Sequence, residues 1–139
     1  MPSSSAPRSV DTFDVSGVTT PETPYPAATR FGEFVFVSGQ VSYDDVAEIM
    51  APGDPYLQTL QALARLDRVL AERGGGLRDV VQATVYLAHA GDVVPFNRAW
   101  REAFGVHRPS RATVVAALLD PRLLVEVQAI AVVRGGEAA

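Results

Sequence analysis

The 139-residue chain contains neither cysteine nor lysine. The lack of cysteine excludes disulfides, thiolate nucleophiles and cysteine-ligated metal sites. The lack of lysine means that the 12 Lys or Arg positions are all arginine, which excludes a Schiff-base amine and a Walker-type phosphate loop. His89 and His107 are the only histidines, too few for a multi-histidine metal site. We therefore predict no metal and no cofactor.

An excess of basic charge and long apolar runs are also missing. The formal net charge is −4 at pH 7, so the sequence lacks the basic footprint of a nucleic-acid-binding protein. No apolar run reaches the roughly 18 residues that a membrane span needs. The opening residues, MPSSSAPRS, lack the apolar stretch of a secretory signal, which makes the cytoplasm the expected location. We expect neither a nucleic-acid nor a membrane partner.

Length and composition predict a single domain. Hydrophobic residues make up 47% of the chain and charged residues 20%, as in ordinary globular proteins. A chain of this length buries roughly two-thirds of the surface that its unfolded form exposes, so it can build its own core. We assign the domain to residues 10–134, flanked by a flexible tail at 1–9 and a flexible C-terminus at 135–139.

Two segments have the pattern of amphipathic helices. Asp54-Pro55 is a favourable cap and first-turn pair, and the leucine-rich stretch after it keeps an apolar face up to Arg73, before Gly74. Asp92 caps a second helix, which Gly105 ends. The apolar stripe of this second helix has the spacing of one helix face and consists of Phe96, Ala99, Trp100, Ala103 and Phe104.

Four segments rich in Val, Phe, Ala and Leu predict strands, namely residues 34–41, 79–88, 111–118 and 123–133. The order of strands and helices indicates an α+β fold in which two helices cover one face of a sheet. Strands that a helix connects can run parallel within it. Because the strand at 123–133 is apolar on both sides, the second face of the sheet also needs cover, which predicts an oligomer built on the sheet.

Two charged residues are the main candidates for chemistry. Glu126 is a lone carboxylate in an almost wholly apolar strand, so it needs either a partner or a raised pKa. The alternative to a catalytic role is an ion pair between strands or subunits. Arg111 starts a strand beside a loop, where a guanidinium can hold a carboxylate through two parallel hydrogen bonds. The alternative for this residue is an ordinary surface arginine.

Weaker signals come from three other places. Ser38-Gly39 ends the first predicted strand, where a glycine allows close backbone approach and a free N–H can bind an anion; the alternative is a plain strand end. Tyr25 lies between two prolines and either walls a pocket or packs over a sheet edge. Asn97 adjoins the apolar stripe of the second helix and is placed to bond a neighbouring loop.

Together these segments resemble the RidA/YjgF family of reactive-intermediate deaminases, from about Pro24 to Val133. The strongest part is the C-terminal pair of blocks, RPSRATV at 108–114 and LVEVQAIAV at 124–132. The supporting matches precede these blocks and have the same order and compatible spacing as in the family. They are Pro24-Tyr25, Val37-Ser38-Gly39-Gln40, the stretch 81–87 and Phe96-Asn97.

The resemblance implies a chorismate-mutase-like fold and a homotrimer with three clefts between subunits. It also implies hydrolysis of enamine and imine acids, such as 2-aminoacrylate, to 2-keto acids and ammonia, with a small imino or keto acid as ligand and no cofactor. By position, Arg111 is implied to bind the substrate carboxylate and Glu126 to position or activate water. The implied pocket residues are Tyr25, Ser38, Gly39 and Asn97.

The chain departs from the family pattern in two places. Thr113 stands where many members have a cysteine, but its hydroxyl and backbone N–H can still bond to substrate, so we keep it among the substrate-binding residues. The segment from Tyr43 to Gly53 looks less typical and is expected to reshape the cleft.

Other functions remain open at this point. A binding module would hold a keto or amino acid in the same cleft without turnover. A specialised enzyme would process or cyclise a larger imine of a biosynthetic pathway, and the segment 43–53 favours this reading. Endoribonuclease activity is attributed to some relatives, but the acidic charge and the lack of a basic or aromatic nucleic-acid face argue against it. A chorismate mutase would share only the fold.

Overall fold

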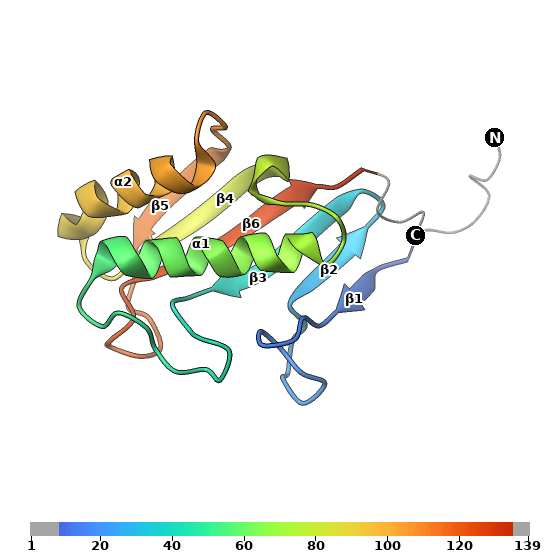
Figure 1. Cartoon of the computed structure of the whole chain (residues 1–139), viewed down its shortest axis with the longest axis horizontal. Helices are drawn as coiled ribbons and strands as arrows, with labels where there is room; N and C mark the ends of the chain where they lie inside the picture. The colour runs from blue at the N-terminus through green and yellow to red at the C-terminus, as the bar shows by residue number, and fades with distance from the viewer. Residues whose placement is uncertain (1–8, 135–139) are drawn as a thin grey trace.

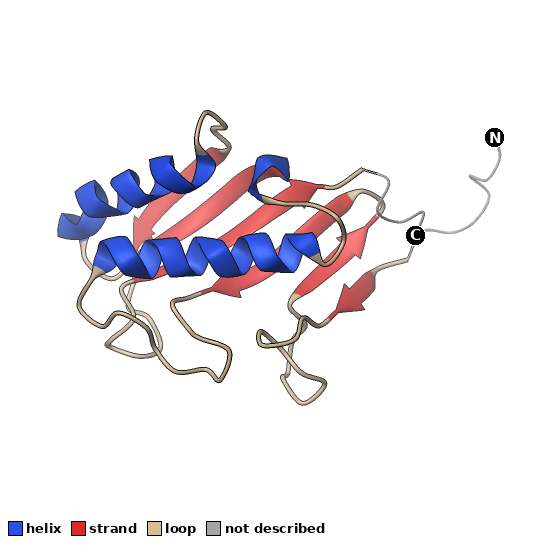
Figure 2. Cartoon of the chain, viewed as in Figure 1, coloured by secondary structure: helices blue, strands red, loops and turns tan. Residues whose placement is uncertain are grey.

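A mixed six-stranded sheet with both helices on one face forms the fold of this computed structural model, which describes residues 9–134 (Figures 1 and 2). The segments predicted to be flexible, 1–9 and 135–139, lie outside the described residues, except for Ser9. The elements in chain order are β1 (Asp11–Phe13), β2 (Ala28–Phe31), β3 (Phe34–Gln40), α1 (Pro55–Ala71), β4 (Val80–Leu87), α2 (Val93–Phe104), β5 (Ser110–Val115) and β6 (Val125–Val132), with short 3-10 turns at Leu77–Asp79 and Ala90–Asp92.

The strand order in the sheet is β1-β2-β3-β6-β4-β5. The last strand in sequence, β6, therefore lies between β3 and β4 and is antiparallel to both. Among the described strands, β4 and β5 form the one parallel pair, which α2 connects. These features confirm the predicted α+β class, the two helices on one face and the parallel alignment of helix-connected strands.

The ends of both helices follow from local chemistry. The Asp54 side chain accepts a hydrogen bond from the backbone N–H of Leu57 at 2.9 Å, with Pro55 in the first turn. The regular part of α1 ends at Ala71 and passes into a turn that reaches Gly74, whose φ is +82°. Asp92 precedes α2 as predicted, but its side chain makes no capping bond there because a 3-10 turn occupies residues 90–92.

Strand bounds were less predictable. The pattern missed β1 and β2, which are only 3 and 4 residues long and become strands by pairing with each other and with β3. The predicted strand at 111–118 ends already at Val115, and the one at 123–133 spans only Val125–Val132. Apolar composition extends beyond both strands, but the ladders end with single backbone bonds at Ala116 and Leu124, and the chain turns at Asp120 between them.

The two faces of β6 differ in cover. The side chains of Val125, Val127, Ala129 and Ala131 are buried against the helices, whereas the residues between them remain partly exposed. Beside them the open face exposes the aromatic rings of Phe34 and Phe36, which are 48% and 41% exposed. In residues 9–134 no helix covers this face (Figure 1). Neither helix of the described chain is long and apolar enough to cross a membrane.

The backbone of Ala47 has a φ of +63°, which is unfavourable for an L side chain, so this residue is expected to lower the stability of the fold. Replacing Ala47 with glycine should raise the melting temperature by about 2–4 °C, the net of relieved strain and a more flexible unfolded chain. Thermal unfolding followed by circular dichroism measures this. The matched control is Ala64→Gly, an exposed position inside α1, which should lower the melting temperature. A similar loss in both variants would contradict the strain at Ala47.

Candidate functional site

Arg111 lies on β5 in register with Ala83 of β4, on the side of the sheet that carries the helices. Its Nε donates to Thr113 Oγ1 at 2.8 Å, and its Nη2 donates to Asn97 Oδ1 of α2 at 2.9 Å. The guanidinium carbon lies 4.9 Å from the centre of the Trp100 ring. The structure thus brings together three residues that the sequence singled out separately, Arg111, Asn97 and Thr113, over an aromatic floor.

The surroundings of Arg111 leave its charge without an acidic partner. Partial burial lowers the pKa of Arg111, and the positive charge of nearby Arg101 acts in the same direction. None of the ion pairs within residues 9–134 involves Arg111. A held, partly dehydrated guanidinium of this kind is suited to bind an anionic group from a ligand.

Glu126 lies on β6 opposite Tyr86, on the open face of the sheet. Gly39 of the neighbouring strand β3 packs against its carboxylate, and a Cβ built at this glycine would overlap Glu126 Oε2. Both residues line a hollow of about 430 Å³ together with Tyr25, which is 56% exposed. The glycine therefore leaves the room in which the Glu126 carboxylate sits.

Burial is the cause that raises the pKa of Glu126. Within the described part of the chain Glu126 takes part in no ion pair, so the ion pair between strands that the sequence left open is absent. A carboxylate whose pKa is raised is a stronger base than an ordinary carboxylate, which suits it to accept a proton from a bound molecule.

Ser38 lies on β3 next to Gly39 and bonds to the segment before β2. Its Oγ donates to the Pro26 carbonyl oxygen at 2.8 Å and does not line the hollow around Glu126. The bond ties β3 to the segment that carries Tyr25, and the Ser38 N–H adds a second tie to the Ala27 carbonyl at 3.0 Å. Ser38 thus supports one wall of the hollow.

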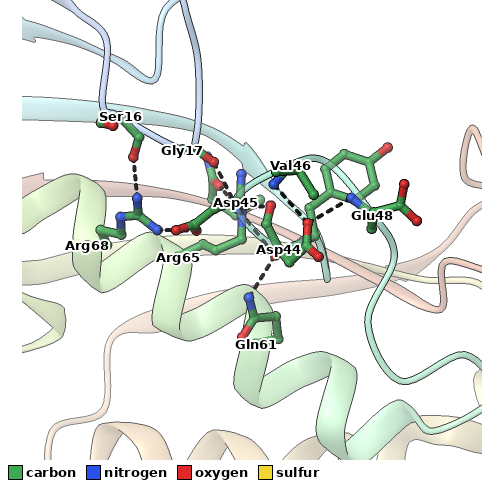
Figure 3. Close-up of polar contacts among 11 residues, drawn as sticks. Ser16, Gly17, Asp44, Asp45, Val46, Glu48, Gln61, Arg65 and Arg68 are labelled. Atoms are coloured by element: carbon green, nitrogen blue, oxygen red, sulfur yellow. Dashed lines mark hydrogen bonds and ion pairs between the residues drawn. The ribbon is translucent and has the colours of Figure 1, made fainter.

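The less typical segment from Tyr43 to Gly53 forms another wall of the same hollow, through Tyr43, Val46 and Ala47 among others. Arg65 of α1, only 5% exposed, holds this wall in place, as Figure 3 shows. Its Nη1 donates to the carbonyl oxygens of Tyr43 and Asp44 at 3.2 and 3.1 Å.

Arg68, one turn away on α1, donates to Asp45 at 2.6 Å and to the Ser16 carbonyl (Figure 3). The sequence pattern missed Arg65. Its position on the buried face of a helix was the available signal, because a buried arginine needs several acceptors.

Arg111 and Glu126 lie in two different hollows of the chain. The cavity at Arg111 has a volume of about 750 Å³ and is also lined by Asn97, Trp100 and Arg101. None of the residues in 9–134 lines both hollows. Arg101 and Arg108 were missed as lining residues of the Arg111 cavity; the signal for Arg101 is its position four residues after Asn97, on the same helix face.

Comparisons with known proteins give consistent matches over most of the chain. The family model described as Endoribonuclease L-PSP matches residues 17–133. A RutC family protein of Pyrococcus abyssi is 36% identical over 108 residues, which cover 78% of this chain and 85% of that protein. The 3-aminoacrylate deaminase RutC of Acinetobacter baylyi is 32% identical over 115 residues, which cover 83% of this chain and 91% of that protein.

Solved structures share the fold as well as the sequence. A putative endoribonuclease from Thermotoga maritima superposes with a TM-score of 0.81 at 31% identity, covering 90% of this chain and 98% of that one. A member of the YjgF protein family from Neisseria meningitidis has a TM-score of 0.75 at 32% identity, covering 91% and 96%. With the family model spanning both hollows, these matches show that the chain belongs to the YjgF/RidA/RutC family.

Proposed function

We propose that the protein hydrolyses reactive enamine and imine acids of the 2-aminoacrylate type to 2-keto acids and ammonia. The observation that carries this proposal is the pairing of two features in one chain: the anion-binding Arg111 without an acidic partner, and the half-buried Glu126 with its raised pKa. The relative from Acinetobacter baylyi, named as a 3-aminoacrylate deaminase, supports an enamine acid as the substrate class.

Arg111 would bind the carboxylate of the substrate. Asn97 and Thr113 hold its Nη2 and Nε, so the guanidinium keeps one orientation before the substrate arrives. Such preorganisation places the imine carbon at a fixed distance from the anchor and lowers the entropic cost of reaction. Trp100 packs against the guanidinium and would shield its contact with the substrate carboxylate from water on one side.

Glu126 would transfer the protons of the hydrolysis. As a carboxylate it accepts a proton from water while the water oxygen forms a bond to the carbon of the imine, whose nitrogen has taken a proton from solvent. Glu126 then donates the proton it accepted to the amino nitrogen of the carbinolamine and accepts the hydroxyl proton, so that the carbon–nitrogen bond breaks, ammonia leaves with the electron pair of that bond and the keto group forms. An enamine first becomes the imine by protonation at its carbon. No cofactor enters this sequence.

A complete site would require a second copy of the chain, because Arg111 and Glu126 lie in different hollows. We therefore propose a homotrimer with clefts between subunits, in which the Arg111 cavity of one subunit meets the Glu126 hollow of the next. The exposed Phe34 and Phe36 on the open sheet face favour such packing, because association would bury both rings.

The test of the proposed function is imine turnover. An amino-acid oxidase generates 2-imino acids from several amino acids in the presence of semicarbazide, which traps the imine. Addition of the protein should reduce semicarbazone formation at least about tenfold and release free keto acid and ammonia instead. Heat-denatured protein is the control. If native protein leaves the semicarbazone yield unchanged for every amino acid, the hydrolase proposal fails and binding without turnover is favoured.

A further inference from the structure

The cavity around Arg111 contains more positive charge than one substrate carboxylate requires. Arg101 and Arg108 line it together with Arg111, and none of the described residues that line it is acidic. None of the three arginines takes part in an ion pair within residues 9–134. This concentration of cations occurs in a chain whose formal net charge is −4, so it is not a consequence of overall composition.

Local structure holds the two extra arginines beside Arg111. Arg101 lies four residues after Asn97 on α2, and therefore on the same face of the helix as the residue that bonds Arg111. Arg101 is close enough for its charge to affect the pKa of Arg111. Their mutual repulsion is unfavourable until an anion is bound.

Arg108 lies in the loop that leads into β5, and its neighbours anchor that loop. His107 Nε2 lies 2.7 Å from the Val80 carbonyl oxygen, and Ser110 Oγ donates to the Val81 carbonyl oxygen at 3.1 Å. These contacts fasten the loop to β4 on both sides of Arg108. The backbone that carries Arg108 is thus held at the cavity.

We infer that the preferred substrate has a second carboxylate, which Arg101 and Arg108 bind while Arg111 holds the carboxylate next to the imine. The inference rests on the proposed function for the reacting group. A monocarboxylate would leave two cations of the cavity uncompensated, whereas a dicarboxylate engages all three. The substrate class is the 2-imino acid of an acidic amino acid, and its hydrolysis consumes one water and releases the 2-keto dicarboxylate and ammonia. The cavity, at about 750 Å³, is large enough for a molecule of this size.

The test compares two imines of nearly equal shape, generated by oxidases from glutamate and from glutamine, which differ in one negative charge. Wild-type protein should have a kcat/KM at least about tenfold higher for the glutamate-derived imine at low ionic strength. In the double variant Arg101→Gln/Arg108→Gln the ratio of the two kcat/KM values should fall close to one. The matched control is Arg98→Gln, an arginine of α2 that stacks on Tyr56 outside the cavity and should keep the wild-type ratio. A wild-type ratio near or below one overturns the inference, as does a ratio that the double variant retains.

A binding measurement separates this inference from the proposed reaction. Calorimetry compares glutarate with pentanoate, two unreactive acids of equal chain length, on wild-type protein and on the double variant. If no imine is turned over but glutarate binds at least about tenfold more tightly than pentanoate, and only in wild-type protein, the second carboxylate site stands and the hydrolase proposal fails. Equal affinity for both acids in wild-type protein overturns the inference whatever the turnover. Circular dichroism checks that the double variant is folded, and the single variants replace it if it is not.

Discussion

Replacing Arg111 with alanine is expected to lower kcat/KM toward 2-imino acids by about 100- to 1,000-fold, close to the uncatalysed rate. The variant loses the charged hydrogen bonds to the substrate carboxylate and, with them, the placement of the imine carbon, for which a displacement of about 1 Å can cost 100-fold. The semicarbazide competition assay, run at several substrate concentrations, measures the loss. The fold should persist, because Asn97 lines the cavity and Thr113 is exposed, so that both side chains can bond to water once the guanidinium is removed.

Two further substitutions show whether activity needs the two parallel hydrogen bonds of the Arg111 guanidinium or only its charge. Arg111→Lys keeps the charge but cannot form two parallel bonds, so its activity should lie between those of the wild type and the alanine variant. Arg98→Ala removes an arginine of α2 that stacks on Tyr56, and it should leave turnover unchanged. Retention of most of the activity in Arg111→Ala would remove this residue from the proposed site.

Mixing two inactive variants is expected to restore about one quarter of wild-type activity. Glu126→Gln should by itself reduce kcat about 100-fold or more, because the amide cannot accept the proton of water. If each site combines Arg111 of one subunit with Glu126 of the next, an Arg111→Ala chain beside a Glu126→Gln chain in the correct order forms an intact site. Random mixing of equal amounts gives this order at one interface in four.

The experiment requires the two proteins to be unfolded together and refolded, so that subunits exchange. The control refolds each variant alone. An equal mixture of wild type with the Arg111→Ala/Glu126→Gln double variant should keep about one quarter of its sites if two chains form each site and about one half if one chain does. If the mixture is no more active than the separate variants, a single chain supplies both residues, and the proposed site between two subunits is wrong. Light scattering on the refolded mixture reports the number of chains in the assembly.

Helix α1 illustrates how much of the fold local pattern predicts. Asp54-Pro55, the apolar spacing that follows and Gly74 are contiguous signals, and the helix follows them to within a few residues at its C-terminal end. The strand cores of β3, β4 and β6 were predicted for the same reason, since alternation and β-branched residues are local properties. In contrast, β1 and β2 are too short to have a pattern and exist because distant segments pair with them.

The candidate residues divide in the same way. The types of Arg111 and Glu126, the lack of cysteine and lysine, and the family resemblance can all be read along the chain, and they restrict the chemistry to anion binding and carboxylate proton transfer. Their arrangement depends on β6 inserting between β3 and β4, which brings Glu126 beside Gly39 on the open face, while Arg111 lies on the helix side beside α2. Strand order and facing arise from pairings between residues far apart in sequence, and these emerge only when the whole sheet and its two helices pack together.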